Sequence, residues 1–442
     1  MATGYLEHTL SAADTNGNKK ATFSAWMKRA KNGVEHVFYT VRQNSTNFFR
    51  FRFDSDKINV TSQVSGTNYY ATTDAVFRDN SAFYHVVVTY DTTQATASNR
   101  IKIYVNGTEQ TLSASNYPSQ DATLFMIASG QPQRVGQESG SGYFDGVMAH
   151  VHYTEGYAYA ATDFGETDST SGIWKPKTSP SVSYGTNGFF LKFENSGAMG
   201  TDSSGNSNTF TVNNSITQNV DTPSNNFATM NPLDNIYFGG TYSNGNLTIQ
   251  SESSSYTFCT STLGVSAGKW YVEAKLSAAD SGGTRIGGTG RTSTGSNNNL
   301  GDRASEFMYQ TNGDLKISNT TTSSWGSTWT TNDIIGIALD LDNNKVYFSK
   351  NGTFQASGNP STGSNGQTIT AASSTSDGFY RFGFSDNDSG GTATFHYNFG
   401  SGFFGTTAVA SANADGNGIG AFEYTVPTGY YALCTKNIKE FG

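Results

Sequence analysis

The sequence predicts an all-β protein made of two antiparallel β-sandwiches in series, followed by a short extended C-terminal segment. Two hairpin signals carry this prediction, because apolar strand patterns run into Asn106-Gly107 and into Asn351-Gly352. Asn-Gly accepts positive φ at both central positions of a type I′ turn, which joins antiparallel strands. The segment 340–345 is a further polar turn that folds two buried strands back on one another. One such hairpin in each half of the chain indicates two sandwiches.

Composition supports this fold class. At 442 residues the chain exceeds the usual size of one core, so two domains are expected. Hydrophobic residues (35%) and charged residues (14%) are both below the globular average, whereas glycine (49 residues) and aromatic residues (13%) are abundant. The aromatic content distinguishes the chain from disordered sequences, which have few aromatic residues and high net charge. Long apolar patterns with helical spacing are scarce, which favours strands.

The charge and the termini exclude several functional classes. A formal net charge of −8 argues against a nucleic-acid partner, and the short basic run 28–31 is expected to be a solvated strand end. No segment approaches the ~18 apolar residues of a membrane span. The N-terminus lacks the layout of a secretory signal, so synthesis in a cytoplasm without ordinary export is expected.

Cys259 and Cys434 are predicted to be buried thiols, with a disulfide between them as the less favoured alternative. No Cys/His spacing indicates zinc.

The strands of the first half are individually recognisable. The segment 21–27 alternates, with Phe23 and Trp26 on opposite faces. The segment 48–53 alternates aromatic residues with Arg50 and Arg52, which are expected to face solvent or a partner. The segment 84–90 is apolar throughout, as in a central sandwich strand.

Five elements follow one another in the first half of the chain, namely Phe23-Ser-Ala-Trp26, 85–91, 103–107, Val135-Gly-Gln137 and 143–151. With these elements, residues 1–195 resemble laminin-G-like, concanavalin-A-like lectin domains. The resemblance implies a two-sheet jelly roll that binds glycans, often with calcium at the rim of the sandwich. Asp54, Asp56 and Asp145 are the calcium candidates, and for each the favoured alternative is that the side chain caps a turn. No other cofactor is expected.

In the second half of the chain, apolar strand patterns occur at 268–275, 334–342, 345–352, 380–384 and 395–400. With these elements, residues 236–400 resemble a SPRY domain. The resemblance implies a twisted sandwich whose edge loops bind a protein or peptide, without catalysis. The loops 288–301 and 313–329 are the expected binding loops, with Trp325 and Trp329 as candidate contacts; core packing is the equally weighted alternative for both.

Residues 196–235 are predicted to connect the two domains, and residues 401–442 to form the extended segment. The two domains are joined to the segments 184–193, 202–206, 221–233 and 426–438. With these segments the chain as a whole resembles structural proteins of marine bacteriophages. This resemblance implies a place on the virion exterior, in tail, fibre or capsid surface, with other virion proteins as partners. A homo-oligomer is expected, and a trimer by analogy with fibres.

A non-enzymatic role in assembly and in binding a host-surface glycan or protein is therefore predicted, and a glycan-cleaving enzyme is the alternative. Such an enzyme needs two suitably spaced carboxylates, and the nearest pairs are Asp54 with Asp56 and Asp340 with Asp342. A metal pair at His150 and His152 is less favoured than ordinary strand histidines. The candidates for stacking on a sugar ring are Tyr69, Tyr70, Tyr157 and Tyr159.

Overall fold

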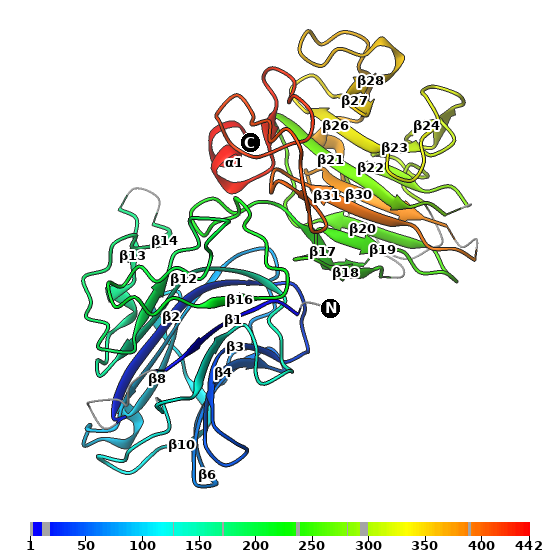
Figure 1. The fold of residues 1–442 in the computed structure, drawn as a ribbon. Coiled ribbons are helices and arrows are strands. Elements are labelled where there is room, and N and C mark those ends of the chain that lie inside the picture. The colour runs from blue at the N-terminus through cyan, green and yellow to red at the C-terminus, as the bar shows by residue number, and fades with distance from the viewer. Residues whose placement is uncertain are drawn as a thin grey trace. The chain divides into compact units, whose positions relative to one another are not determined.

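The computed structural model describes residues 3–10, 18–126, 128–169, 172–235, 239–280, 282–291, 299–387 and 390–442. The chain is nearly all β and forms two compact units, Met1–Gln218 and Asn219–Gly442, hereafter the first and the second unit (Figure 1). The predicted all-β fold class is confirmed. None of the described helices is both long enough and apolar enough to cross a membrane.

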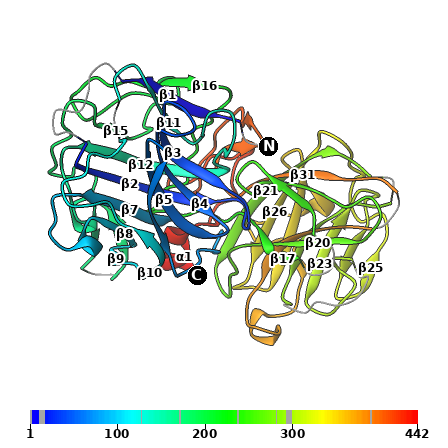
Figure 2. The ribbon, with the colours of Figure 1, turned by 90° about the horizontal axis from the view of Figure 1, so that it is seen from below.

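The first unit is a sandwich of two antiparallel sheets. In one sheet the described strands follow the order β10-β6-β5-β4-β3-β11-β1-β16, and in the other β15-β12-β2-β7-β8-β9, an order that can be followed in Figure 2. Their bounds are β1 (Tyr5–Thr9), β2 (Lys20–Arg29), β3 (His36–Arg42), β4 (Phe48–Asp54), β5 (Lys57–Val64), β6 (Thr67–Thr73), β7 (Tyr84–Asp91), β8 (Ile101–Val105), β9 (Thr108–Glu109), β10 (Leu112–Asn116), β11 (Pro132–Val135), β12 (Gly146–Glu155), β15 (Phe189–Leu191) and β16 (Thr211–Asn213).

An aromatic core lies between these sheets. Phe49, Phe51 and Phe53 of β4 all enter it, as the alternation of that strand predicts. Phe23 of β2 reaches them from the opposite sheet, with its ring centroid 5.2 Å from that of Phe51. Such aromatic contacts stabilise a thin sandwich because each ring buries a large apolar area.

The outer face of the sheet that contains β2 and β7 is covered by a segment of the same unit, residues 156–169 and 172–185, hereafter the cover segment. It includes the short strand pair β13 (Gly165–Thr167) and β14 (Trp174–Pro176). Its Phe164 packs against Val87 of β7, and Trp174 and Tyr159 join the same cluster. Strand β2 is consequently buried on both faces.

The second unit is also a two-sheet sandwich. In one sheet the described strands follow the order β17-β20-β30-β22-β23-β24-β25, and in the other β18-β19-β31-β21-β26-β27-β28, with β29 and β34 paired beside it. Their bounds are β17 (Met230–Asn235), β18 (Thr241–Ser243), β19 (Thr248–Gln250), β20 (Thr257–Ser261), β21 (Lys269–Ala278), β22 (Arg285–Thr289), β23 (Glu306–Gln310), β24 (Leu315–Ile317), β25 (Thr320–Thr322), β26 (Ile334–Asp340), β27 (Lys345–Lys350), β28 (Thr353–Phe354), β29 (Gln367–Thr368), β30 (Arg381–Asp386), β31 (Thr394–Asn398) and β34 (Tyr431–Ala432).

The C-terminal segment, residues 399–442, covers the outer face of the sheet that contains β21 and β27. Its Phe422 and Tyr430 pack with Tyr271 and Tyr347 of these strands in a second apolar cluster. The segment contains β32 (Phe403–Phe404), β33 (Thr407–Ala408) and β34, and it ends in helix α1 (Thr435–Phe441). The predicted extended tail is therefore largely irregular chain packed on the second unit, and its last residues are helical.

Glu273 of β21 holds the C-terminal segment in place through hydrogen bonds to its backbone. Its buried carboxylate accepts hydrogen bonds from the backbone N–H groups of Glu423 and Tyr424, each at 2.8 Å, and from the hydroxyl of Tyr271 at 3.1 Å. Burial raises the pKa of Glu273 to about 7, although these hydrogen bonds act in the opposite direction.

Both predicted Asn-Gly hairpins are present. Asn106 (φ 49°) and Gly107 (φ 82°) join β8 to β9, and Asn351 (φ 48°) and Gly352 (φ 80°) join β27 to β28. The turn 340–345 likewise joins β26 to β27. Cys259 and Cys434 are buried, and no disulfide joins them, as predicted.

Strands also occur in the predicted connector. β16 pairs with β1 of the first unit, and β17 pairs with β20 of the second unit. The residues between 196 and 235 are thus divided between the two units, because each strand completes a sheet.

Candidate functional site

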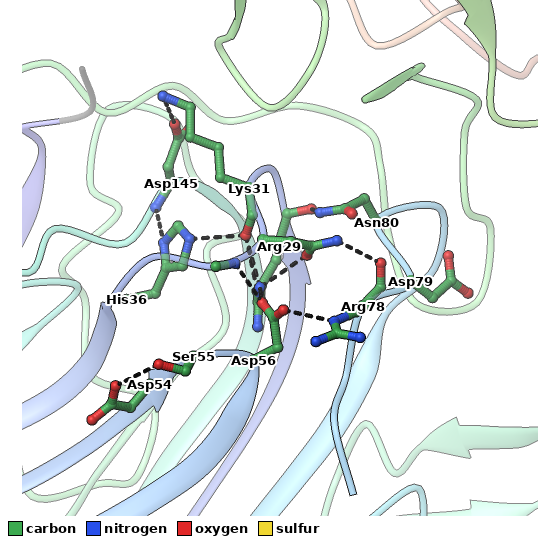
Figure 3. A network of polar contacts seen from close by, with 12 residues as sticks. Arg29, Lys31, His36, Asp54, Ser55, Asp56, Arg78, Asp79, Asn80 and Asp145 are labelled. Atoms are coloured by element: carbon green, nitrogen blue, oxygen red, sulfur yellow. Dashed lines mark hydrogen bonds and ion pairs between the residues drawn. The ribbon is translucent and has the colours of Figure 1, made fainter. Parts of the chain in front are cut away.

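The three calcium candidates lie at one end of the first unit. Asp56 sits in the turn between β4 and β5, with its backbone in the left-handed region (φ 67°). Its Oδ1 accepts hydrogen bonds from Arg29 Nη2 and from the Gly33 N–H, each at 2.7 Å, and its Oδ2 accepts one from Arg78 Nε at 2.9 Å (Figure 3). Only 1% of the Arg29 side chain and 5% of the Asp56 side chain are exposed.

This arrangement keeps Asp56 ionised. Burial alone would raise the pKa of Asp56, but the hydrogen bonds from Gly33, Arg29 and Arg78 outweigh burial and hold the pKa below its usual value. The carboxylate therefore ties three chain segments together, namely the end of β2, the β4–β5 turn and the segment that precedes β7.

Asp54 and Asp145 each have a separate cation. Asp54 pairs with Arg52 at 2.7 Å, and Asp145 pairs with Lys31 at 3.8 Å (the latter drawn in Figure 3). A calcium ion needs several oxygen ligands converging on one point. Here each carboxylate faces a different positive side chain, so the donor set as arranged does not fit calcium. No cluster of three or more potential metal-ligating residues occurs among the described residues.

The basic run 28–31 is not the solvated strand end that was expected. Lys28 and Arg29 are both buried, the first over the ring of Phe83 and the second over the ring of Phe53, at 5.3 Å and 4.4 Å from the ring centroids. The prediction was wrong because the partners of these cations, above all Asp56, come from distant parts of the sequence.

Arg50 and Arg52 lie on the face of β4 opposite the core, as the alternation predicts. Arg50 Nη1 contacts Glu138 Oε2 at 2.6 Å, and Arg42 of β3 pairs with the other oxygen of the same carboxylate. Arg52 pairs with Glu35 as well as with Asp54. These arginines are therefore engaged in ion pairs within the unit, which the alternation of the strand alone does not predict.

Tyr69 and Tyr70, the neighbouring candidates on β6, point to opposite faces. Tyr69 packs against the core of the first unit and is partly buried. Tyr70, on the other face and partly exposed, pairs across the sheet with Thr61 of β5.

Tyr157 and Tyr159, in the cover segment, form a stacked pair. Their ring centroids are 5.8 Å apart with an interplanar angle of 17°, and 42% of Tyr157 is exposed. The Tyr159 hydroxyl accepts a hydrogen bond from the Ser183 N–H at 2.8 Å, which fixes the inner ring. Tyr157 thus presents a supported aromatic face at the surface of the first unit.

Two threonines, the buried Thr22 and the partly buried Thr89, hold the backbone beneath this pair. Thr22 of β2 donates to the Tyr157 carbonyl at 3.0 Å and accepts from the Tyr159 N–H at 2.8 Å. Thr89 of β7 donates to the Tyr159 carbonyl at 2.7 Å. The outward threonines of these strands are the part of the site that the sequence reasoning missed.

In the second unit the two tryptophan candidates differ. Trp329 is 3% exposed and packs in the core against Tyr309 and Phe395, so it is not available to a ligand. Trp325 is partly buried, edge-on to Tyr309 and Phe348. Of the predicted binding loop 288–301, residues 292–298 lie outside the described part of the chain.

Comparison with known families agrees with these two folds. Residues 2–156 match the model of the concanavalin A-like lectin/glucanases superfamily, and residues 269–372 match that of the SPRY domain. The chain contains a lectin-like domain and a SPRY domain. No curated protein sequence matches it.

Parts of the chain were also matched to solved structures, all at low identity and low TM-score. The SPRY domain of human HERC1 is 16% identical, with a TM-score of 0.30, over 38% of this chain and 96% of that one. A heptameric SAP-like pentraxin from Limulus polyphemus is 15% identical, with a TM-score of 0.27, over 36% and 72%. A human SPRY domain is 14% identical, with a TM-score of 0.26, over 34% and 91%.

Two histidines of the lectin-like domain, His85 and His152, contact the cover segment. His85 Nδ1 accepts a hydrogen bond from the Trp174 indole N–H at 2.9 Å, and its Nε2 is 2.9 Å from Ser24 Oγ. Because an indole N–H is only a donor, the His85 proton lies on Nε2, and the imidazole is neutral. Burial lowers the pKa of His85 to about 3.

His150 and His152 have stacked rings with centroids 6.5 Å apart. His152 is buried, and its Nδ1 lies 2.9 Å from the hydroxyl of Tyr184 in the cover segment. This hydrogen bond gives His152 a structural role within the sandwich. Such a role is the interpretation that the sequence favoured over a metal pair.

The acid pair Asp340 and Asp342 shapes a hairpin of the SPRY domain. Asp340 is buried, pairs with Lys269 at 3.0 Å and accepts from the Asn343 N–H at 3.0 Å. Asp342 accepts from the Gly268 N–H at 2.8 Å. Both carboxylates thus stabilise the β26–β27 turn.

Proposed function

We propose that this chain is a non-enzymatic structural protein of a virion exterior, in tail, fibre or capsid surface. Its lectin-like domain binds a host-surface glycan, and its SPRY domain attaches it to another virion protein. The copies form a homo-oligomer, with a trimer expected. The virion part of this proposal rests on the resemblance of the joined segments to structural proteins of marine bacteriophages.

The exposed ring of Tyr157 is the observation that carries glycan binding. Sugar rings stack their apolar C–H faces on aromatic side chains, and a ring with a fixed position loses little conformational entropy on binding. Tyr157 meets this requirement, since Tyr159 supports it from behind and Thr22 fixes the backbone.

Ion pairing of the acidic candidates supports a binding role over catalysis. A glycosidase acid needs a raised pKa and a base opposite to it. Asp56 instead has a lowered pKa between two arginines, and Asp54 pairs with Arg52.

A glycan array probed with the purified full chain tests the lectin part. We expect a defined set of host-surface glycans to bind, with at least tenfold weaker binding by Tyr157→Ala. Tyr256→Ala, a partly exposed tyrosine of the second unit, is the matched control and should bind as the unmodified chain does. Equal binding by Tyr157→Ala would reject this site.

Cryo-electron microscopy of particles purified from an infected culture tests the virion part. Ordered symmetric copies of the chain on capsid or tail are expected. Particles without the chain would reject the assignment.

A further inference from the structure

We propose that the second unit carries its own binding site for an uncharged sugar, in a pocket between the chain after β28 and the C-terminal segment. The pocket has a volume of about 380 Å³, within the range of about 300–1,000 Å³ typical of small-molecule sites. One wall consists of residues 358–361 with Phe354, and the other of residues 425–428.

The floor of the pocket is apolar. Pro360, Val426 and Pro427 are buried, and Phe354 is partly buried against the apolar cluster of the C-terminal segment. Phe354 is the apolar side chain that remains partly exposed to a ligand. Its ring suits the C–H face of a pyranose, because little side-chain entropy is lost when a packed aromatic ring is covered.

The rim supplies neutral hydrogen-bonding groups. Asn359, Thr425 and Thr428 line it and offer one amide and two hydroxyl groups. Ser361, also at the rim, accepts a hydrogen bond from the Thr428 N–H at 3.0 Å, so the two walls are linked before a ligand arrives. A ligand with several hydroxyl groups matches these donors and acceptors.

The lack of charged side chains in the pocket lining indicates the class of ligand. None of the described residues that line the pocket is charged. A charged group that lost its water there would gain no ion pair in return, which is unfavourable. The pocket therefore favours an uncharged sugar over an acidic one.

The backbone beside the pocket adopts an uncommon conformation. Ala356 (φ 50°) and Ser357 (φ 56°) are consecutive non-glycine residues in the left-handed region. Such residues are strained and cluster at binding sites, where the surrounding structure holds them. Here they position the wall that carries Asn359 and Pro360.

The second wall lies outside the family match. The SPRY model matches residues 269–372, whereas residues 425–428 belong to the C-terminal segment. This site is also separate from the one proposed at Tyr157, which lies in the first unit.

Saturation-transfer NMR with the full chain tests the proposal, using neutral methyl glycosides as probes and glucuronic acid and sialic acid as charged counterparts. The chain carries Tyr157→Ala throughout, so that the site proposed in the first unit does not contribute to the signal. We expect at least one neutral glycoside to give a transfer signal and neither acid to do so. Thr425→Trp, which fills the pocket from an exposed position, should abolish the signal, and Asn359→Ala should weaken binding at least threefold.

One control variant shows whether the signal comes from this pocket. In the Tyr157→Ala background, Thr321→Trp places the same side chain on the exposed strand β25 of the other sheet and should leave the signal unchanged. The proposal is overturned if no neutral glycoside binds to the Tyr157→Ala chain or if the signal survives Thr425→Trp. Displacement of the glycoside only by charged ligands, or binding only of a proline-rich peptide, would also overturn it.

Discussion

Arg29 donates a hydrogen bond to Asp56 at 2.7 Å in a setting where both side chains are almost completely buried. A buried ion pair of this kind gains little over apolar packing, but removing one partner leaves an uncompensated charge. At this end of the first unit the pair also fixes the position of Arg78, whose side chain is exposed.

We predict that Asp56→Ala lowers the free energy of unfolding of the first unit by about 3–5 kcal/mol, because Arg29 is left buried without its carboxylate. Asp54→Ala, which removes an acid that is 43% exposed, should cost no more than ~1 kcal/mol. Urea unfolding monitored by tryptophan fluorescence, together with thermal unfolding in a calorimeter, measures the loss of unfolding free energy for both variants. Equal losses would mean that burial of the Asp56 pair does not matter.

Calcium should not stabilise the first unit. A site with micromolar affinity would add about 4 kcal/mol at a thousandfold excess of free ion over its dissociation constant. Because Asp54, Asp56 and Asp145 each face a positive side chain, we expect the melting temperature to be the same in millimolar calcium and in chelator. A calcium-dependent rise of several degrees would show that these carboxylates rearrange around the ion.

The first unit should lose stability in acid through His85. Its folded pKa of about 3 lies below the ordinary 6.5, so the unfolded chain binds a proton that the folded chain excludes. This contribution is complete above pH 6.5 and falls by roughly 1.4 kcal/mol per pH unit as the pH drops toward 3. His85→Gln, which cannot titrate, should show a shallower decline in unfolding experiments between pH 6.5 and 4. An unchanged slope would contradict the assignment.

The second unit should respond in the opposite sense through Glu273. Its pKa is raised from 4.5 to about 7 by burial, so this contribution is complete below pH 4.5 and is lost as the pH rises through 7. The difference corresponds to ~3 kcal/mol. Glu273→Gln should remove this part of the pH dependence in calorimetry between pH 4.5 and 8. Glu306, whose pKa burial also raises to about 7, remains in that variant as an internal comparison.

Substitution of the two tryptophans predicted as ligand contacts in the SPRY domain should destabilise the second unit to different extents. Trp329→Ala should destabilise the second unit by about 3–5 kcal/mol, since the side chain fills the core beside Tyr309. Trp325→Ala should cost clearly less, because that ring is only partly buried. Chemical unfolding of both variants provides the test, and the reverse order would be inconsistent with the packing described.

Local chemistry accounts for what the sequence predicted well. The dipeptides Asn106-Gly107 and Asn351-Gly352 are sufficient to predict their turns. The alternation around Arg50 is sufficient to predict which side chains of β4 face the core. Both predictions are independent of the rest of the chain. The fold class follows from many such signals.

The site depended on partners that are far apart in sequence. Nothing near Asp56 indicates that Arg29 will neutralise it, and nothing near Tyr157 indicates that Thr22 will hold its backbone. For Trp329, the sequence favoured core packing and ligand contact in a binding loop equally, and the packing against Tyr309 decides for the core. Tertiary pairing decides each case, and a linear pattern does not encode it.

The residues that match the SPRY family are fewer than the residues that fold together in the second unit, because the sandwich also needs the chain after residue 372. A fragment ending at residue 372 would lose β30 and β31, each of which lies between two other strands, and would expose Tyr271 and Tyr347 to water. Such a fragment is expected to aggregate through open sheet edges. Recombinant dissection of this protein should therefore cut between the units near residue 218 and keep the chain intact from there to residue 442.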